Sequence, residues 1–186
     1  MASNDTKLGI GLSTGMFFHA PKGTALPAYP LEELEAAWVH VGDVSADGIS
    51  LSMERSTEDL RNWANQIKRT IMTEHSEKVQ ATVMDTTQEV LKTLLGDENV
   101  TSEAATTAHG AVVKATLSGA TLPDDEAFLF LMKDGDDAMA VGCTDGQITE
   151  MDSITFAPGA AITWTPTITA HGDGWKLIMD DGQKTT

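Results

Sequence analysis

Cysteine is nearly absent from this sequence. The 186 residues contain one, Cys143, which excludes an internal disulfide and fits folding in a reducing compartment. Cys143 lies in an apolar, strand-like run, so we favour a small buried side chain over the alternative, a catalytic thiol. Without disulfides a hydrophobic core must hold the chain, and 41% hydrophobic residues are enough for one domain.

Basic residues are also scarce. Twelve Lys and Arg stand against 28 Asp and Glu, which gives a formal net charge of −16. Proteins that bind nucleic acid without sequence preference need basic side chains to displace counterions from phosphates, so this composition argues against such binding. A strongly acidic surface would instead let nucleic acid pass without adhering.

Long apolar runs are missing. No stretch approaches the ~20 apolar residues of a membrane-spanning helix. The first residues, "MASNDTKLGIGLSTGMFF", lack the basic leader and continuous apolar segment of a signal peptide. We therefore expect no association with a membrane and no export by a signal peptide.

Motifs that carry chemistry are not found either. The five histidines are scattered, and no HExxH, phosphate-binding glycine loop or GxSxG motif occurs. His171 and Asp173 in "HGDG" are imaginable as an acid–base pair of a hydrolase, but the glycines favour a tight turn between strands. The sequence thus predicts a protein that is not an enzyme and has no cofactor, metal or catalytic residue.

Alternation of apolar and polar residues dominates what is present. It predicts antiparallel strands, and residues 127–132, "AFLFLM", are apolar on both faces, which is typical of a strand covered on both sides. The polar residues 73–78 separate two predicted strands and suggest a hairpin there. The predicted strands lie at residues 49–53, 67–71 (with Ile67, Arg69 and Ile71 on one face), 79–83, 112–117, 127–132, 138–143, 148–156, 161–170 and 175–179.

One helix is predicted over about residues 87–95. Thr86 and Glu89 have the spacing of a capping box, and Gly96 stands where a C-terminal cap belongs. Its apolar stripe needs a sheet to cover it.

The N-terminal part reads differently. Residues 1–30 predict an irregular arm with one short strand candidate, Gly15 to Ala20, and Leu31 to Trp38 has the spacing of a short helical turn. The fold class is therefore mostly β with one flanking α-helix (α+β), an antiparallel β-sandwich or barrel over residues 31–186 preceded by the arm.

All three arginines of the chain lie in "SMERSTEDLRNWANQIKRTI", residues 52–71. Arg55, Arg61 and Arg69 flank Trp63 in an otherwise polar stretch. A solvated loop whose arginines pair within the molecule is one interpretation. The other is an interface, because Trp and Arg are enriched at energetically important contacts.

The order of motifs resembles a known family. "FFHAPKGTALP", "GDVSADGISLSMERSTEDLRNWANQ", a hairpin and a short helix closed by "LKTLLGDENVT" are similar to the major tail protein of long-tailed bacteriophages, the subunit of the tail tube. The resemblance runs from about Gly15 to Thr101. The family shares its fold with the tube protein of type VI secretion systems, so a secretion tube is the nearest alternative to exclude.

This resemblance implies a structural protein of the virion tail, made in the cytoplasm of the bacterial host. It implies hexameric rings that stack into a hollow tube, the conduit through which the genome is ejected, with DNA passing unbound. The implied partners are further copies and the tail tip, tape measure and tail terminator proteins. The long inter-ring loop of the family corresponds to Met53 to Ala64, about residues 53–64.

Two sets of inter-subunit contacts follow as hypotheses. Cationic Arg55 and Arg61 would bridge to carboxylates of a neighbour, with Arg69 beside them and Trp63 as buried contact. The N-terminal arm would become ordered only on assembly and would lay its apolar residues on a neighbour: Met16, Phe17 and Phe18.

A binding module is the rival of a different class. A β-sandwich that recognises a carbohydrate or a protein would use exposed aromatic side chains, and Trp38, Trp164 and Trp175 are the candidates. Each lies in or beside an apolar stretch, so core packing is the preferred interpretation for all three.

Overall fold

One large antiparallel sheet forms most of the molecule. The structure, a computed structural model, describes residues 6–12 and 16–183. Its elements are β1 (Ile10–Gly11), β2 (Phe17–Pro21), β3 (Val39–Gly42), β4 (Val44–Arg61), β5 (Ile67–Val83), α1 (Gln88–Leu95), the short 3₁₀ turn η1 (Asp97–Asn99), β6 (Val100–Glu103), β7 (Val112–Ala115), β8 (Glu126–Asp134), β9 (Asp137–Met151), β10 (Pro166–Ala170) and β11 (Lys176–Asp180).

The main sheet has the strand order β3-β2-β8-β9-β10-β5-β4. The 15-residue strand β9 pairs with β8 along one edge, and its other edge pairs first with β11 and then with β10. β6 and β7 form a separate two-stranded sheet. The fold class predicted from the sequence, mostly β with a single helix and antiparallel pairing, is confirmed.

Strand β8 is the centre of the core. Phe128 and Phe130 face one hydrophobic cluster, which includes Phe17, Ile168 and the helix residue Val90. Its alternate residues, Ala127, Leu129 and Leu131, face a second cluster. Because successive side chains of a strand point to opposite faces, a strand covered on both sides must be apolar throughout. The prediction for residues 127–132 is confirmed.

Helix α1 packs on the first cluster through its apolar face. Val90, Leu91 and Leu94 are buried, and Gly96 ends the helix with a φ of 88°. The N-terminal cap is Thr87, whose Oγ1 accepts a hydrogen bond from the Val90 amide at 3.2 Å. The predicted capping residue, Thr86, was therefore one position early. Its Oγ1 instead accepts a hydrogen bond from Trp164 Nε1 at 3.0 Å.

The predicted helical turn at Leu31–Trp38 is wrong. This segment connects β2 to β3 through turns and bends, and Trp38 is buried in the second cluster, with Leu34 packed against it. Two turns of helix seldom form unless packing stabilises them, because nucleation is costly. Here the apolar side chains reach the core from an irregular backbone.

The short strand predicted at Gly15 to Ala20 within the N-terminal arm is present as β2. This strand lies inside the main sheet between β3 and β8. Phe17 is fully buried, and its ring stacks on that of Phe130 at 4.5 Å. Met16 and Phe18 are partly buried against the two clusters. Residues 1–5 and 13–15 of the arm, including Gly15 of the strand candidate, lie outside the described residues.

The hypothesis that Phe17 becomes ordered only on assembly, by packing on a neighbouring subunit, is therefore wrong. Its side chain is already covered by its own chain, which leaves no surface for a partner. The contacts of Met16 and Phe18 likewise lie within the molecule. A strand that completes a sheet satisfies its backbone groups and buries its side chain at once, and both gains are available without assembly.

Replacing Phe17 tests this placement. Phe17→Ala should lower the free energy of unfolding by about 3–5 kcal/mol, the usual range for a buried Phe. Denaturant unfolding at low protein concentration measures it. Phe156→Ala, at a side chain that is 65% exposed, is the control and should change stability by less than about 0.5 kcal/mol. Equal effects of the two substitutions would contradict the buried position of Phe17.

Candidate functional site: the projecting hairpin and its sheet

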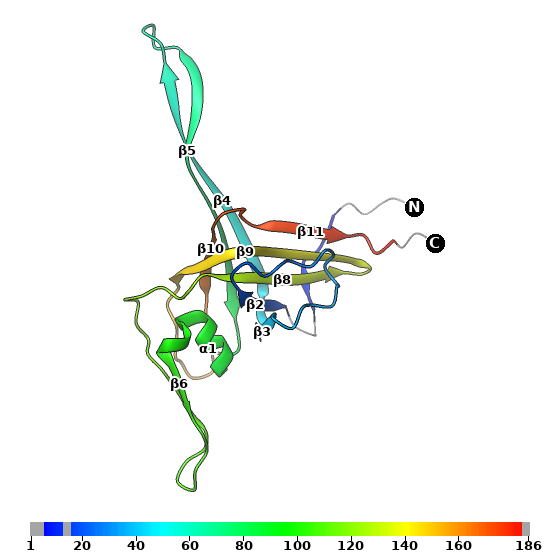
Figure 1. Cartoon of the computed structure of the whole chain (residues 1–186), viewed down its shortest axis with the longest axis vertical. Helices are drawn as coiled ribbons and strands as arrows, with labels where there is room; N and C mark the ends of the chain where they lie inside the picture. Colours follow the sequence, from blue (N-terminus) through cyan, green and yellow to red (C-terminus); the bar gives the residue numbers. More distant parts are fainter. Residues whose placement is uncertain (1–5, 13–15, 184–186) are drawn as a thin grey trace.

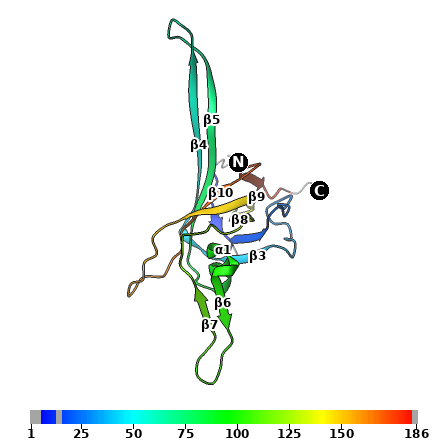
Figure 2. The same cartoon turned by 60° about the vertical axis from the view of Figure 1, so that its left-hand side comes forward.

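Strands β4 and β5 form a hairpin that projects far from the body of the molecule (Figures 1 and 2). Residues 51–61 and 67–75 are all exposed, and we call this part the projecting hairpin. Its turn is closed by the Asn62 amide, which donates to the Gln66 carbonyl at 3.0 Å. Asn65 has a φ of 59°, a conformation that asparagine adopts more readily than most residues.

The hairpin predicted around residues 73–78 is wrong. These residues belong to the continuous 17-residue strand β5, whose partner is β4. Residues 73–75 are exposed, so burial in a core does not impose an alternation of apolar and polar side chains there. The turn lies at residues 62–66 instead, and the predicted loop 53–64 is extended strand up to Arg61.

Two irregularities change which residues share a face. The register passes from Glu74 to Met72 opposite Ser56 and Thr57, and from Arg69 to Ile67 opposite Leu60 and Arg61, so Thr73 and Lys68 have no partner in the ladder. Each such bulge moves the following side chains to the other face. Ile67 and Arg69, predicted to share a face, therefore lie on opposite faces.

Both faces of the projecting hairpin carry exposed apolar side chains, which are 43–62% accessible. Soluble proteins that expose such a concentration of apolar surface generally use it for contact. One face has four of these residues and the other has two: Leu51, Met53, Ile67 and Met72 on the first, Leu60 and Ile71 on the second. Trp63 in the turn is fully exposed.

The predicted contact residues Arg55, Arg61, Trp63 and Arg69 all lie on this hairpin. Arg61 is bound within it, to Asp59 Oδ2 at 3.3 Å and to the Asn65 carbonyl at 3.1 Å. Within residues 6–12 and 16–183, the guanidinium groups of Arg55 and Arg69 have no hydrogen bond or ion pair. Intramolecular pairing thus accounts for one arginine of the three.

Charge is distributed unevenly between the hairpin and the body. Residues 60–72, which we call the hairpin tip, contain Arg61, Lys68 and Arg69 and no acidic residue, a net charge of +3. Subtracting this from the chain's −16 leaves −19 on the remainder. The hairpin tip is therefore basic and carries apolar side chains, whereas the rest of the chain is strongly acidic.

At the base of the hairpin, the sheet β9-β10-β5-β4 has one apolar and one polar face. Pairing carries the alternation across the strands, so whole rows share a face. The row Leu51, Val79, Ile168 and Ile148 borders the core. The neighbouring row on the other face is Ser50, Gln80, Thr167 and Glu150.

This second face, which we call the polar face, is held together by hydrogen bonds between side chains. Lys78 Nζ lies 3.3 Å from Glu150 Oε1, and Gln80 Nε2 donates to Asp152 Oδ2 at 3.1 Å. Hydroxyl pairs add to these, Thr82 with Thr165 at 3.0 Å and Thr149 with Thr169 at 2.8 Å. Each residue in these bonds is partly or fully exposed, so this side of the sheet faces solvent in the single subunit.

A second, shorter hairpin points the opposite way. β6 and β7 leave the body at the end remote from the projecting hairpin (Figures 1 and 2). Val100 at its root is buried against the core that α1 covers, and an ion pair between Lys114 and Glu103 crosses its strands. The molecule therefore has projections at both ends of its long axis.

The tryptophans proposed for a binding module are occupied elsewhere. Trp38 and Trp164 are buried in the two clusters, and Trp175 packs against the first, with its ring 6.1 Å from that of Phe130. Core packing, the preferred interpretation, is confirmed for these three residues. The exposed tryptophan is Trp63, on the hairpin.

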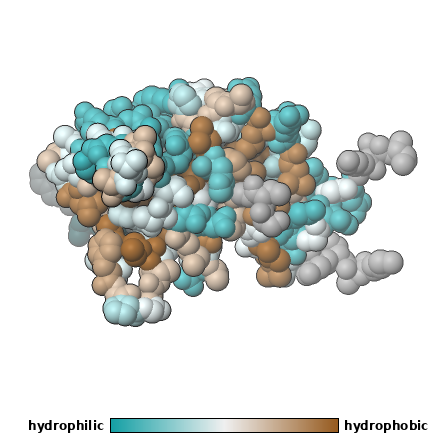
Figure 3. All heavy atoms as spheres, turned by 90° about the horizontal axis from the view of Figure 1, so that it is seen from below, coloured by the Kyte–Doolittle hydropathy of each residue, from teal (hydrophilic) through white to brown (hydrophobic). Residues whose placement is uncertain are grey.

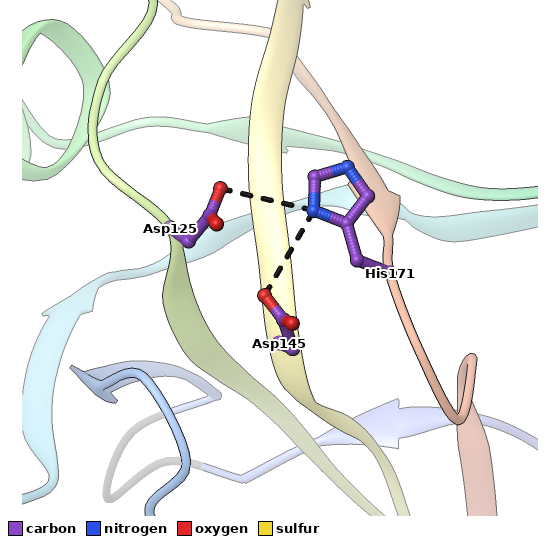
Figure 4. A group of neighbouring side chains, drawn as sticks. All are labelled: Asp125, Asp145 and His171. Carbon is purple, nitrogen blue, oxygen red and sulfur yellow. Dashed lines mark ion pairs between the residues drawn. The ribbon is translucent and has the colours of Figure 1, made fainter.

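Four residues distant in sequence converge at one end of the sheet. His171 Nδ1 lies 3.7 Å from Asp125 and 3.8 Å from Asp145 (Figure 4). Lys22 Nζ reaches the same carboxylates, at 2.9 and 3.0 Å. The hydrogen bond to Asp125, and then that to Asp145, raise the pKa of Lys22 above its usual 10.5. The ammonium group of Lys22 lies between the two carboxylates, where a bound metal ion would otherwise have to lie. We therefore interpret the cluster as a set of intramolecular ion pairs.

The imagined acid–base pair of His171 and Asp173 does not form. Asp173 binds Lys176 Nζ at 3.2 Å, while His171 faces Asp125 and Asp145. Cys143 is buried, and burial raises the pKa of its thiol to about 12, so the nucleophilic thiolate is almost absent at neutral pH. Burial of Cys143 agrees with its predicted role.

Comparison with known protein families matches residues 1–184 to the family described as phage tail tube protein. The chain belongs to this family. It is thus a structural protein of the phage tail, and the family is not one of enzymes. A search of curated proteins finds no match. Within the part of this tail tube protein that the structure describes, no helix is long and apolar enough to cross a membrane.

The Lys22 ion pairs should stabilise the tail tube protein below strongly alkaline pH. Because the pKa of Lys22 is raised in the folded state, its contribution is complete below pH 10.5 and is lost as the pH rises through the raised value. Lys22→Met should lower the melting temperature at pH 7 and lose that difference above pH 10.5. Lys176→Met, which removes an exposed pair with Asp173, is the control and should have little effect. A deficit of Lys22→Met that persists unchanged into strong alkali would rule out this origin.

Proposed function

We propose that this protein forms hexameric rings that stack into the tail tube, and that its polar face lines the lumen through which the genome is ejected. Family membership supports a tube subunit. The observation that carries the rest is the polar face of β9-β10-β5-β4, a sheet whose other side is core and two of whose strands, β4 and β5, continue into the projecting hairpin.

The chemistry of the polar face suits passage of DNA without binding. Its acidic residues, Glu150 and Asp152, repel phosphates, and the cation Lys78 is already paired with Glu150. The remaining side chains that we assign to it are mostly hydroxyls and amides, which carry no charge. A wall without free cations offers phosphates no site at which to release counterions and adhere.

Stacking of acidic subunits requires a compensating contact. A ring of six copies multiplies the net charge of −16, and rings in contact repel one another. The projecting hairpin supplies guanidinium groups that can bind carboxylates in a bidentate manner. We assign Arg55, Arg61 and Arg69 to ion pairs with a neighbouring subunit and Trp63 to buried contact.

The further partners follow from this role. A tube needs a tail tip to start from, a tape measure inside and a terminator at its end, and we propose these proteins as partners in the virion, with synthesis in the host cytoplasm. A type VI-like secretion tube is the nearest alternative. A carbohydrate-binding module is disfavoured, because Trp38, Trp164 and Trp175 are packed in the core.

Charge reversal tests the role of the hairpin. The double substitution Arg55→Glu with Arg61→Glu should leave a folded protein that forms no rods when concentrated protein is imaged by electron microscopy. The control is Lys92→Glu with Lys176→Glu, which changes the net charge equally at sites outside the hairpin and should still form rods. Normal tubes from the arginine variant would refute this assignment.

The lumen assignment is tested by reversing the acidic pair. Phage carrying Glu150→Lys and Asp152→Lys should assemble tails but release DNA more slowly, with a delay that shrinks as salt is added, because the new lysines hold phosphates. Glu33→Lys with Glu35→Lys, on the exposed connection between β2 and β3, is the matched control. Identical ejection rates of the two variants in low salt would show that the polar face does not border the DNA.

A further inference from the structure

A pocket lies at the base of β4, at the end of the strand opposite to the hairpin turn. Its volume is about 570 Å³, and we call it the base pocket. Beside the pocket, the β4–β5 ladder shifts register between Val44 and Ile49, and residues 45–48 of β4 have no partner in this ladder. Its lining includes Gly11, Met16, Val44, Ile49, Phe130 and Met132.

The walls of the base pocket are largely apolar, and its surroundings are acidic. Asp47 lines it, and Asp43 precedes the lining residue Val44. Asp43 donates its amide to Asp85 Oδ2 at 2.7 Å, which holds a third carboxylate nearby. Within the described ranges, none of these three carboxylates has an ion pair with a basic residue. The pocket thus combines an apolar interior with free negative charge.

The hairpin tip has the complementary properties. Trp63 is fully exposed, and Lys68 and Arg69 beside it are without ion pairs in the described chain. Pockets of about 300–1,000 Å³ hold ligands of drug size, so the base pocket has room for an indole and part of its flanking chain. An exposed indole among free cations therefore matches an apolar pocket among free carboxylates.

The tip cannot reach the pocket of its own molecule. At about 3.3 Å per residue, β4 extends roughly 40 Å from Ile49 beside the pocket to Arg61 beside the tip. Figure 3, which views the end opposite to the projecting hairpin, shows apolar surface (brown) between polar areas. The occupant must come from a second molecule.

We propose that Trp63 of one copy inserts into the base pocket of a second copy, with Lys68 and Arg69 facing Asp43, Asp47 and Asp85. The inference rests on the proposed self-assembly and assigns the receptor of the hairpin. A projection and its receptor at opposite ends of β4 form a heterologous contact, which builds an open filament where the rotation between copies does not close a ring. The geometry thus gives the direction of stacking.

Cysteine cross-linking tests this contact. Ala64→Cys, next to Trp63 in the exposed turn, and Ala46→Cys, in two separate proteins that both keep Trp63, are mixed, allowed to assemble and treated with a mild oxidant. Ala46 lines the pocket, and native Cys143 is buried with its pKa near 12, so it does not compete. The mixture should form covalent dimers, whereas Ala64→Cys mixed with Ala161→Cys, an exposed position outside the pocket lining, should not.

A second measurement removes the dependence on introduced thiols. Trp63→Ala, which changes a fully exposed side chain and should keep the melting temperature, and Ala46→Trp, which fills the pocket, should each abolish rods. Trp63→Phe should retain part of the assembly.

The outcomes separate this inference from the proposed function. Rods without cross-linking between positions 64 and 46, or rods from both Trp63→Ala and Ala46→Trp, overturn the base pocket as receptor and leave the tube intact. Wild-type protein that never forms rods overturns the proposed function, and the docking with it.

Discussion

The antiparallel ladder between β4 and β5 is the constraint on which the rest of the structure depends. Its register places Val79, Ala81 and Val83 in the core and puts Ser50 and Gln80 on the opposite side. The same ladder continues beyond the last core residue, where no layer covers it. The two strands β4 and β5 therefore contribute to the core, to the polar face and to the projecting hairpin. A shift of their register by one residue would turn the core side chains of the shifted strand toward the polar face, and its polar side chains toward the core.

Electrostatics explains why the projection differs from the body. A subunit with −19 outside its hairpin tip gains solubility and repels phosphates, but it also repels other copies. In the proposed assembly, arginines placed on the projecting hairpin would bring opposite charge to a neighbour without neutralising the polar face. Arg61 additionally pairs with Asp59 within the hairpin and helps to order the turn, whereas Arg55 and Arg69 have no hydrogen bond or ion pair within the described residues.

The elements that could be predicted from the sequence are those whose burial produces a regular pattern of apolar residues. β8 is apolar on both faces, and α1 has one apolar stripe and a glycine at its end. The turn of the hairpin was misplaced, because a strand exposed on both faces loses alternation and reads as a loop. The error at Leu31–Trp38 has a different cause. Apolar residues there have helical spacing, but they pack against the core from a segment of turns and bends.

Only the part of the candidate site that lies in one continuous stretch of sequence could be predicted. Trp63 among arginines stands out in the sequence, whereas the polar face and the base pocket arise from the register of strands far apart in the chain, which no local pattern records. Phe17 was assigned to a neighbour because an apolar residue near the N-terminus does not reveal which sheet it completes. The cluster around Lys22 was missed because its members are scattered from residue 22 to residue 171.

If each hairpin docks in the pocket of the next copy as proposed, the placement of a basic tip and an acidic pocket at opposite ends of β4 gives any finite stack two unlike ends. One terminal ring presents unengaged indoles and cations, and the other presents vacant, carboxylate-rimmed hollows. Proteins that initiate and cap such a stack must therefore be chemical opposites of each other, so a single cap cannot serve both extremities.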